Sequence, residues 1–291
     1  MDDLDHIPQT FLGLPDSGTG RAAARVAVLP VPFEATTSYG SGTRDGPAAI
    51  LAASRQVETY VADLGMDLAE APIHTLPPVA PDLSAPDAMD RRLLAVARPL
   101  VAEGLFVLAL GGEHSITAPL VAAVAEAHGE LGVLHVDAHL DLRDTFEGTP
   151  HSHACAMRRV VEAGHRTVHV GIRSACPEEV ALAEARSLPV FWARDCVAGA
   201  GWIDRAVAAL GDPVYVSVDC DGLDPSVIRS VGTPEPGGLG WWPTMALLDR
   251  VFAERRVLGA DVVELAPAGD RASDFAAAKL AVRLAALAVR G

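Results

Sequence analysis

The sequence is short of cysteine, aromatic residues and positive charge, and these shortages exclude several classes of protein. Aromatic residues make up 5% of the chain, and the cysteines are limited to Cys155, Cys176, Cys196 and Cys220, with no CxxC pair among them. Reduced thiols in a cytoplasmic protein are therefore expected, rather than a disulfide-stabilised extracellular fold. The 38 Asp and Glu residues outnumber 23 Lys and Arg residues, giving a formal net charge of −15. This balance argues against a nucleic-acid partner, because no basic surplus is available to neutralise phosphates.

Long apolar runs are also missing. No stretch approaches the roughly 18 apolar residues needed to span a bilayer, and the acidic start MDDLDHIPQT is unlike the basic start of a signal peptide. We therefore expect a cytoplasmic location and no membrane partner. The sequence is instead rich in Ala, Val and Leu, and its 291 residues suit one large α/β domain with a continuous core.

Short β-branched runs alternate with Ala-rich segments of helical spacing, which predicts a parallel sheet covered by helices. The expected strands, each buried on both faces, are 25–31, 105–110, 131–136, 167–172, 189–192, 213–218 and 257–265. The expected helices are 47–59, 87–102, 118–127, 177–185, 202–210 and 272–289. Residues 1–24, rich in Pro, Gly, Ser and Asp, are predicted to form an N-terminal arm, and residues 25–291 a single catalytic domain.

Carboxylates and histidines cluster where predicted strands end. The strand 131–136 runs into HVDAHLDLRD, in which Asp137, His139 and Asp141 are spaced by two. In an extended backbone such alternate side chains share one face, so the three groups could converge on one or two cations. The alternative for this stretch taken alone is an acidic, solvated loop.

Two further strand ends favour a metal site. PVYVSV leads into Asp219 and Asp221, and LFVLAL leads into GGEHS, where His114 follows two glycines. Carboxylates gathered at the carboxyl edge of a parallel sheet would repel one another without a cation. Two histidines and four carboxylates without thiolates suit a borderline-hard divalent ion, manganese before zinc. Asp224, which precedes a proline, is predicted to be a turn residue instead.

GGEHS, DAHLD and SVDCDGLDPS resemble, in order and spacing, the metal motifs of the manganese-dependent ureohydrolases, the arginase and agmatinase superfamily. The similarity runs from about Val31 to the C-terminal helix. It implies a three-layer α/β/α sandwich with a mainly parallel sheet of about eight strands, in a trimeric or hexameric assembly. It also implies two manganese ions per subunit, bridged by Asp137 and Asp219. One ion would be held by His114, Asp137, Asp141 and Asp219, and the other by His139, Asp137, Asp219 and Asp221.

The resemblance further implies hydrolysis of a guanidino compound to an amine and urea through a metal-bridging hydroxide. The guanidinium carbon is a poor electrophile, and two cations could lower the pKa of a shared water toward about 7 to supply the strong nucleophile it requires. His153, within SHACAMRR, takes the place of the family's proton shuttle and, with the metal-binding Asp141, is predicted to be catalytic. His151 could face the same cleft and is kept as an alternative substrate-binding residue. Cys155 is not expected to act as a nucleophile.

The substrate-binding residues depart from the family pattern. The loop with which arginases grip a carboxylate is not visible after Asp141, so the preferred small cationic substrate is agmatine, hydrolysed to putrescine and urea in polyamine biosynthesis. The family's guanidinium-binding glutamate is expected about where Pro243 stands, and proline can neither carry charge nor accept the substrate's hydrogen bond. Glu235 or Glu264 could replace it. Trp241 could stack on a cation, or pack in a core or interface instead.

Two kinds of alternative stay open. Guanidinobutyrase, arginase and formiminoglutamate hydrolase share the same metal chemistry, and a substrate carrying a carboxylate would require an Arg or Lys over the cleft. Arg143, Arg158 and Arg173 are the candidates for that position. A catalytically silent, metal-binding homologue is the alternative from another class, and the Pro243 departure is its sole support.

Overall fold

The computed structural model describes residues 9–15 and 20–291, and its centre is an eight-stranded parallel sheet. Its strands are β1 (Val26–Val31), β4 (Ile73–Thr75), β5 (Phe106–Gly111), β6 (Gly132–Val136), β7 (Arg166–Ile172), β8 (Val190–Trp192), β9 (Val214–Asp219) and β10 (Val257–Val263). They lie side by side in the order β4-β1-β5-β10-β9-β6-β7-β8. A separate antiparallel pair is formed by β2 (Tyr60–Val61) and β3 (Met66–Asp67).

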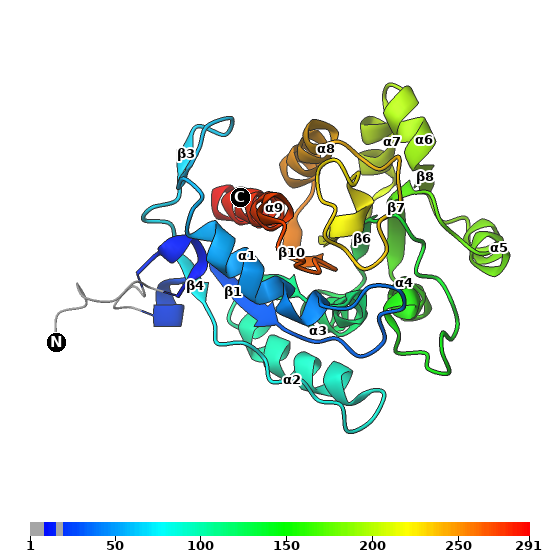
Figure 1. Cartoon of the computed structure of the whole chain (residues 1–291), viewed down its shortest axis with the longest axis horizontal. Helices are drawn as coiled ribbons and strands as arrows, with labels where there is room; N and C mark the ends of the chain where they lie inside the picture. Colours follow the sequence, from blue (N-terminus) through cyan, green and yellow to red (C-terminus); the bar gives the residue numbers. More distant parts are fainter. Residues whose placement is uncertain (1–8, 16–19) are drawn as a thin grey trace.

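Helices cover both faces of this sheet, which confirms the predicted three-layer α/β/α sandwich (Figure 1). One layer contains α2 (Ala88–Ala102), α3 (Thr117–His128) and α4 (Ala156–Glu162). The opposite layer contains α1 (Gly46–Ser54), α6 (Ala193–Ala198), α7 (Trp202–Ala209), α8 (Trp241–Glu254) and α9 (Arg271–Arg290). The short α5 (Pro177–Ala185) lies beyond β7 at one end of the molecule. No helix in the described part of the chain has the length and apolar character needed to cross a membrane.

The strand sequences explain the two layers. All six residues of β1 are buried, and consecutive side chains of a strand point to opposite faces. Val26 and Val28 accordingly join the core beneath α9, whereas Ala27 and Leu29 join the core beneath α2 and α3. A strand buried on both faces is mostly apolar, which is why these runs could be recognised in the sequence.

Some elements were not predicted. The edge strand β4 has only three residues, Ile-His-Thr, and no apolar run marks it. Helices α4, α6 and α8 were also missed, and α8 begins with the sequence Trp-Trp-Pro. Pro243 is tolerated there because N–H groups in the first turn of a helix have no intrahelical acceptor. The last predicted strand was too long, because β10 ends at Val263 and Glu264 adopts a left-handed φ of 63°.

Part of the predicted N-terminal arm packs against the domain. Phe11 and Leu12 are buried, and their N–H groups donate to Thr75 Oγ1 at 2.9 Å and Ser54 Oγ at 3.0 Å. These contacts join the segment to β4 and α1. Residues 1–8 and 16–19 of the predicted arm lie outside the described residues.

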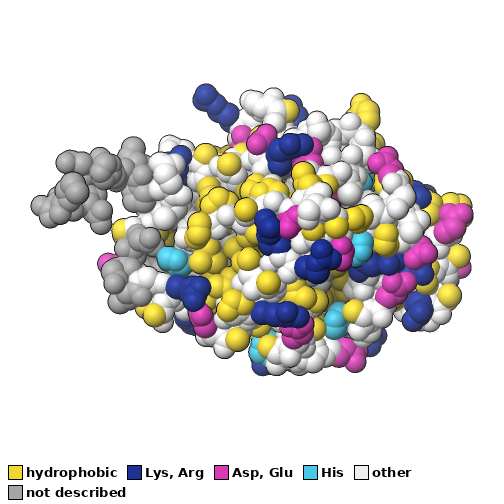
Figure 2. Space-filling model, turned by 90° about the horizontal axis from the view of Figure 1, so that it is seen from below, with side chains coloured by type: hydrophobic (Ala, Val, Ile, Leu, Met, Phe, Trp, Pro, Cys, Tyr) yellow, Lys and Arg dark blue, Asp and Glu magenta, His cyan; other side chains and the backbone are white. Residues whose placement is uncertain are grey.

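Charges on the face that carries α2 are mixed in sign (Figure 2). Arg98 pairs with Glu126 at 2.6 Å, and Arg91 pairs with Asp87 one helical turn away. Arg98 and Arg91 thus each lie beside an acidic side chain on this face.

Gly112 allows the backbone that follows β5 to approach the backbone that follows β1. Its N–H donates to the Val31 carbonyl at 2.9 Å, and the Glu113 N–H donates to the Phe33 carbonyl at 2.9 Å. A Cβ built on Gly112 would lie 1.9 Å from the Phe33 oxygen. Only glycine permits this approach, which fixes the strand ends next to His114.

Replacing Gly112 by Ala is expected to lower the free energy of unfolding by about 1–3 kcal/mol, because two hydrogen-bonded backbone segments must separate. Urea denaturation followed by circular dichroism measures the change. Gly240→Ala is the matched control, since a Cβ there would meet Pro243 at an ordinary 3.6 Å and the φ of −76° suits any residue. Equal stability of the two variants would contradict the close approach.

Candidate metal centre

Three strands deliver polar side chains to one edge of the sheet. His114 follows β5, Asp137 follows β6, and Asp219 is the last residue of β9. In the sheet, β5 and β9 flank β10, and β6 lies beside β9, so these strand ends are close in space although far apart in the sequence. The predicted convergence at the carboxyl edge is therefore present.

Four of the predicted ligands form a first group, in which three aspartates surround His114. Its Nδ1 atom lies 3.0 Å from Asp137 Oδ2, 3.2 Å from Asp141 Oδ2 and 3.1 Å from Asp219 Oδ2. All four side chains are buried. One nitrogen and three carboxylate oxygens thus face a common point.

The remaining two predicted ligands form a second group with Asp137. His139 Nδ1 lies 3.3 Å from Asp137 Oδ1 and 3.2 Å from Asp221 Oδ2. Asp137 therefore faces both groups, one through each oxygen, as a bridging ligand would. Asp219 contacts the first group through Oδ2, while its Oδ1 accepts the Asp221 N–H at 2.7 Å.

Hydrogen bonding behind His114 shows that the first group suits a metal ion. Ser217 Oγ donates to Asp261 Oδ1 at 2.6 Å, so at 2.9 Å it can only accept a proton from His114 Nε2. A neutral His114 then directs the lone pair of Nδ1 toward the carboxylates. This buried nitrogen has no hydrogen-bond partner among the described residues. A divalent cation would satisfy the lone pair and the oxygens together.

The electrostatics of the site also favour a cation. Burial opposes a charge on His114, yet the neighbouring carboxylates raise its pKa well above the usual range. Burial likewise opposes a charge on His139, but Asp137 and Asp221 raise its pKa to about 12. Burial, followed by the charge of Asp221, raises the pKa of Asp219 well above normal. The centre therefore attracts positive charge, either a proton or a metal ion.

The backbone after β6 does not follow the extended path assumed from the sequence. His139 donates its N–H to Asp137 Oδ1 at 2.6 Å, and Asp141 has a left-handed φ of 52°. Alternate residues of an extended strand would stand about 6.6 Å apart, too far to share one cation. The turn brings Asp141 back to His114, so the prediction of convergence holds but its geometric reason was wrong.

Two buried histidines that contact the candidate centre were missed in the sequence. His135 Nε2 lies 2.8 Å from Asp137 Oδ2, and His135 Nδ1 lies 2.8 Å from His169 Nδ1. His169 Nε2 in turn lies 2.8 Å from Thr167 Oγ1. Because a carboxylate only accepts, His135 Nε2 donates to Asp137. Burial, followed by the charge of His135, lowers the pKa of His169 well below normal. Such a chain orients a ligating carboxylate. The sequence feature that could have revealed them is one histidine inside each of two predicted apolar strands, His135 and His169.

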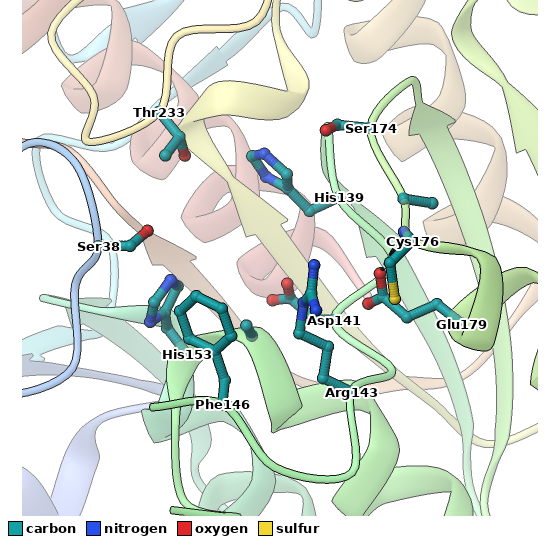
Figure 3. Close-up of a pocket in the computed structure, with 12 residues that line it drawn as sticks. Ser38, His139, Asp141, Arg143, Phe146, His153, Ser174, Cys176, Glu179 and Thr233 are labelled. Carbon is teal, nitrogen blue, oxygen red and sulfur yellow. Dashed lines mark hydrogen bonds between the residues drawn. The ribbon is translucent and has the colours of Figure 1, made fainter. Parts of the chain in front are cut away.

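A pocket lies over the metal groups, and Figure 3 shows His139, Asp141 and His153 facing it. His153 begins the short helix η6 (His153–Cys155), and the Phe146 ring packs perpendicular to it at 5.8 Å. The other lining residues are Ser38, Arg143, Ala154, Ser174, Ala175, Cys176, Glu179 and Thr233. Cys155 is buried, and burial raises the pKa of its thiol to about 11, which keeps it protonated near neutral pH.

Several predicted substrate contacts lie elsewhere. His151 does not line the pocket. Its Nδ1 instead lies 2.7 Å from Asp90 Oδ2. Glu235 does not line the pocket either. Trp241 and Pro243 belong to the first turn of α8 and line other cavities. The structure therefore does not bring His151, Glu235 or Trp241 to the pocket, and Pro243 does not mark a missing carboxylate there.

Glu264 lies beside the metal groups. It follows β10, is buried, and accepts the His114 N–H through Oε1 at 2.7 Å. Burial, followed by the charge of Glu113, raises the pKa of Glu264 well above its usual range. Of the two carboxylates predicted as replacements, neither lines the pocket, but Glu264 contacts the backbone of His114 beside the metal groups.

Known proteins are similar to this chain in sequence and in fold. The model of the Arginase family matches residues 24–287. An N(1)-aminopropylagmatine ureohydrolase from Synechocystis is 42% identical over 96% of both chains, and an agmatinase from Pyrococcus horikoshii is 37% identical over 87% of this chain and 88% of its own. The solved proclavaminate amidino hydrolase from Streptomyces clavuligerus aligns with a TM-score of 0.88 and 30% identity over 98% of both chains. The resemblance drawn from the three motifs is confirmed.

Asp137→Ala removes the carboxylate that faces both groups, so manganese is expected to lose its stabilising effect. A ligand at 100 times its Kd stabilises the protein that binds it by about 2.7 kcal/mol. Thermal unfolding with and without manganese, together with metal analysis after dialysis, tests this, and Asp219→Ala is expected to behave alike. Asp224→Ala is the control, because that carboxylate only caps a turn. Full manganese stabilisation of Asp137→Ala would refute the centre.

Proposed function

The chain belongs to the arginase family and is an agmatinase-like hydrolase of linear amidines, and from this premise we propose how its site works. The proposed reaction hydrolyses a guanidino compound to an amine and urea with two manganese ions. The observation that carries the proposal is the convergence of two histidines and four aspartates beneath one pocket.

His114, Asp137, Asp141 and Asp219 would hold one ion, and His139, Asp137 and Asp221 the other, with Asp219 as the proposed second bridge. Ligands dominated by oxygen, with no thiolate, favour manganese over zinc. When bound, the two ions supply a water acidic enough to act as a hydroxide nucleophile near neutral pH.

Glu264 is proposed to bind the substrate guanidinium. Its Oε1 is occupied by the His114 N–H, whereas Oε2 accepts no hydrogen bond from any residue the structure describes. A buried carboxylate without a cation gains most from a charge-assisted bond to a guanidinium. This contact would orient the guanidinium carbon over the metal groups.

His153 is proposed to protonate the leaving amine. When the C–N bond breaks, its electron pair remains on the departing nitrogen, which then requires a proton. His153 lines the pocket opposite His139 and is the other histidine of that lining (Figure 3). Its position supports general acid catalysis.

The proposed substrates are guanidino compounds with an amine tail, N(1)-aminopropylagmatine or agmatine. Support comes from the names of the relatives that are 42% and 37% identical. Ser38, Ser174 and Thr233 provide hydroxyl oxygens that can accept hydrogen bonds from an ammonium group. The net charge of −15 also attracts cations.

One observation favours a second candidate. Arg143 lines the pocket and rests over the Phe146 ring at 5.1 Å, with no ion pair to any described residue. Arg158 pairs with Glu162 at 2.7 Å, and Arg173 donates to backbone carbonyls, so neither is available. A free guanidinium in the pocket would suit a substrate that ends in a carboxylate, such as 4-guanidinobutyrate.

We also propose that the protein forms a homo-oligomer. Trp242 and Phe275 are 67% and 41% exposed and line one cavity on the α8 and α9 side of the molecule. Exposed aromatic side chains in one patch are typical of a protein interface.

Urea release by the manganese-loaded protein distinguishes the substrates. N(1)-aminopropylagmatine and agmatine are expected to give a kcat/KM at least about tenfold above that of 4-guanidinobutyrate or arginine, a difference of about 1.4 kcal/mol in transition-state binding. Formiminoglutamate is assayed beside them for formamide and ammonia. A preference for 4-guanidinobutyrate that disappears in Arg143→Gln would establish the second candidate. No turnover by fully metallated protein would indicate a silent homologue.

His153→Ala is expected to lower kcat by about 10²–10⁴-fold with unchanged manganese content, because a general acid is removed and no metal ligand is. Steady-state kinetics and metal analysis are measured on the same preparations. His151→Ala is the matched control and is expected to keep its rate, since that ring pairs with Asp90 outside the pocket. Loss of manganese from His153→Ala would contradict the assignment.

A further inference from the structure

Glu113 is a fully buried carboxylate that none of the proposed steps uses. It accepts four hydrogen bonds. Oε2 accepts the N–H groups of Ala35 at 2.5 Å and Thr36 at 2.7 Å. Oε1 accepts the hydroxyls of Thr36 at 2.7 Å and Ser115 at 2.6 Å. Four donors fill the acceptor sites of an ionised carboxylate, so the direction of each hydroxyl is fixed.

Thr36 links this carboxylate to His153. Its single hydroxyl proton points to Glu113, so toward His153 the oxygen can only accept. It accepts the His153 N–H at 3.0 Å and lies 3.3 Å from His153 Nδ1. Ser152 Oγ lies at the same 3.3 Å from Nδ1 and can share that proton. Thr36 can bond to Nδ1 only when that nitrogen carries hydrogen, and Nε2 has no hydrogen-bond partner in the described part of the chain.

The support for this link comes from the sheet. Thr36 follows β1 and Glu113 follows β5, and these two strands are paired along their whole length. The Glu113 N–H also donates to the Phe33 carbonyl at 2.9 Å, which joins the two segments beyond the strands. His153 comes from a separate loop, so Thr36 holds it to the rigid edge that also carries His114.

We propose that Thr36, oriented by Glu113, is a positioning residue for His153. The inference rests on the proposed role of His153 as proton donor. With Nδ1–H bonded to Thr36, the imidazolium gives the proton on Nε2 to the departing nitrogen as the C–N bond breaks. The neutral ring keeps Nδ1–H, and its Nε2 lone pair can take up a proton for the next turnover. The hydroxyl of Thr36 thus selects which nitrogen exchanges protons with the pocket.

Kinetics of two Thr36 variants measure this role. Thr36→Val keeps the shape but removes the acceptor, and it is expected to lower kcat about tenfold, the effect of one hydrogen bond, with little change in KM or manganese content. Thr36→Ser restores the hydroxyl and is expected to recover most of the rate. Thr75→Val is the matched control, because that hydroxyl also accepts a backbone N–H, from Phe11 at 2.9 Å, but lies away from the pocket.

A double-mutant cycle separates positioning from general structural support. Adding Thr36→Val to His153→Ala is expected to cause no further loss of kcat, because the residue acts through the missing ring. If the loss of kcat in the double variant equals the product of the losses in the two single variants, the proposal is overturned. Should Thr36→Val not fold, Glu113→Gln enters the same cycle, since its amide would donate where the carboxylate accepts. A full rate in His153→Ala would refute the shuttle itself, whereas a full rate in Thr36→Val alone would refute only this inference.

Discussion

Buried carboxylates repel one another unless a positive charge lies among them, and the architecture of this protein depends on that constraint. Desolvating an ionised group costs several kcal/mol, so three aspartates around the His114 nitrogen are not compatible with a dry core of their own accord. The strands of the sheet place these aspartates at its carboxyl edge, and the turns that follow the strands bring their side chains together. A divalent ion bound among these carboxylates would offset their repulsion.

Three hydrogen-bonded groups behind the candidate metal centre share one feature, because each ends on a carboxylate that accepts the hydrogen bond nearest to it. Asp261 accepts the Ser217 hydroxyl and so determines which nitrogen of His114 is free. Asp137 accepts from His135 at the end of a chain that starts at Thr167. Glu113 does the same for Thr36. Pre-organisation of this kind removes rotational freedom before substrate arrives.

The sequence predicted features that depend on local patterns and missed those that depend on contacts between distant segments. Buried parallel strands are mostly apolar, which made most of the eight visible, and the ligands stood out as polar residues directly after them. The strand β8 was also predicted, but it lies at the sheet edge with half-buried or exposed residues and is not buried on both faces. His135 and His169 were missed because their pairing requires the register of β6 against β7. Pro243 was assigned to the pocket by analogy, but helix α8 directs it to another cavity. The turn at Asp141 left no clear signal, since a left-handed φ is uncommon for any residue other than glycine, although aspartate adopts it more often than most.

The strand order has a consequence for how the centre forms during synthesis. The last strand of the chain, β10, lies between β5 and β9, which carry His114 and Asp219. These two ligands cannot face each other until residues 257–263 have been inserted between their strands. Assembly of the first group therefore requires the C-terminal strand, whereas Asp137, His139 and Asp221 follow the neighbouring strands β6 and β9 and do not depend on it.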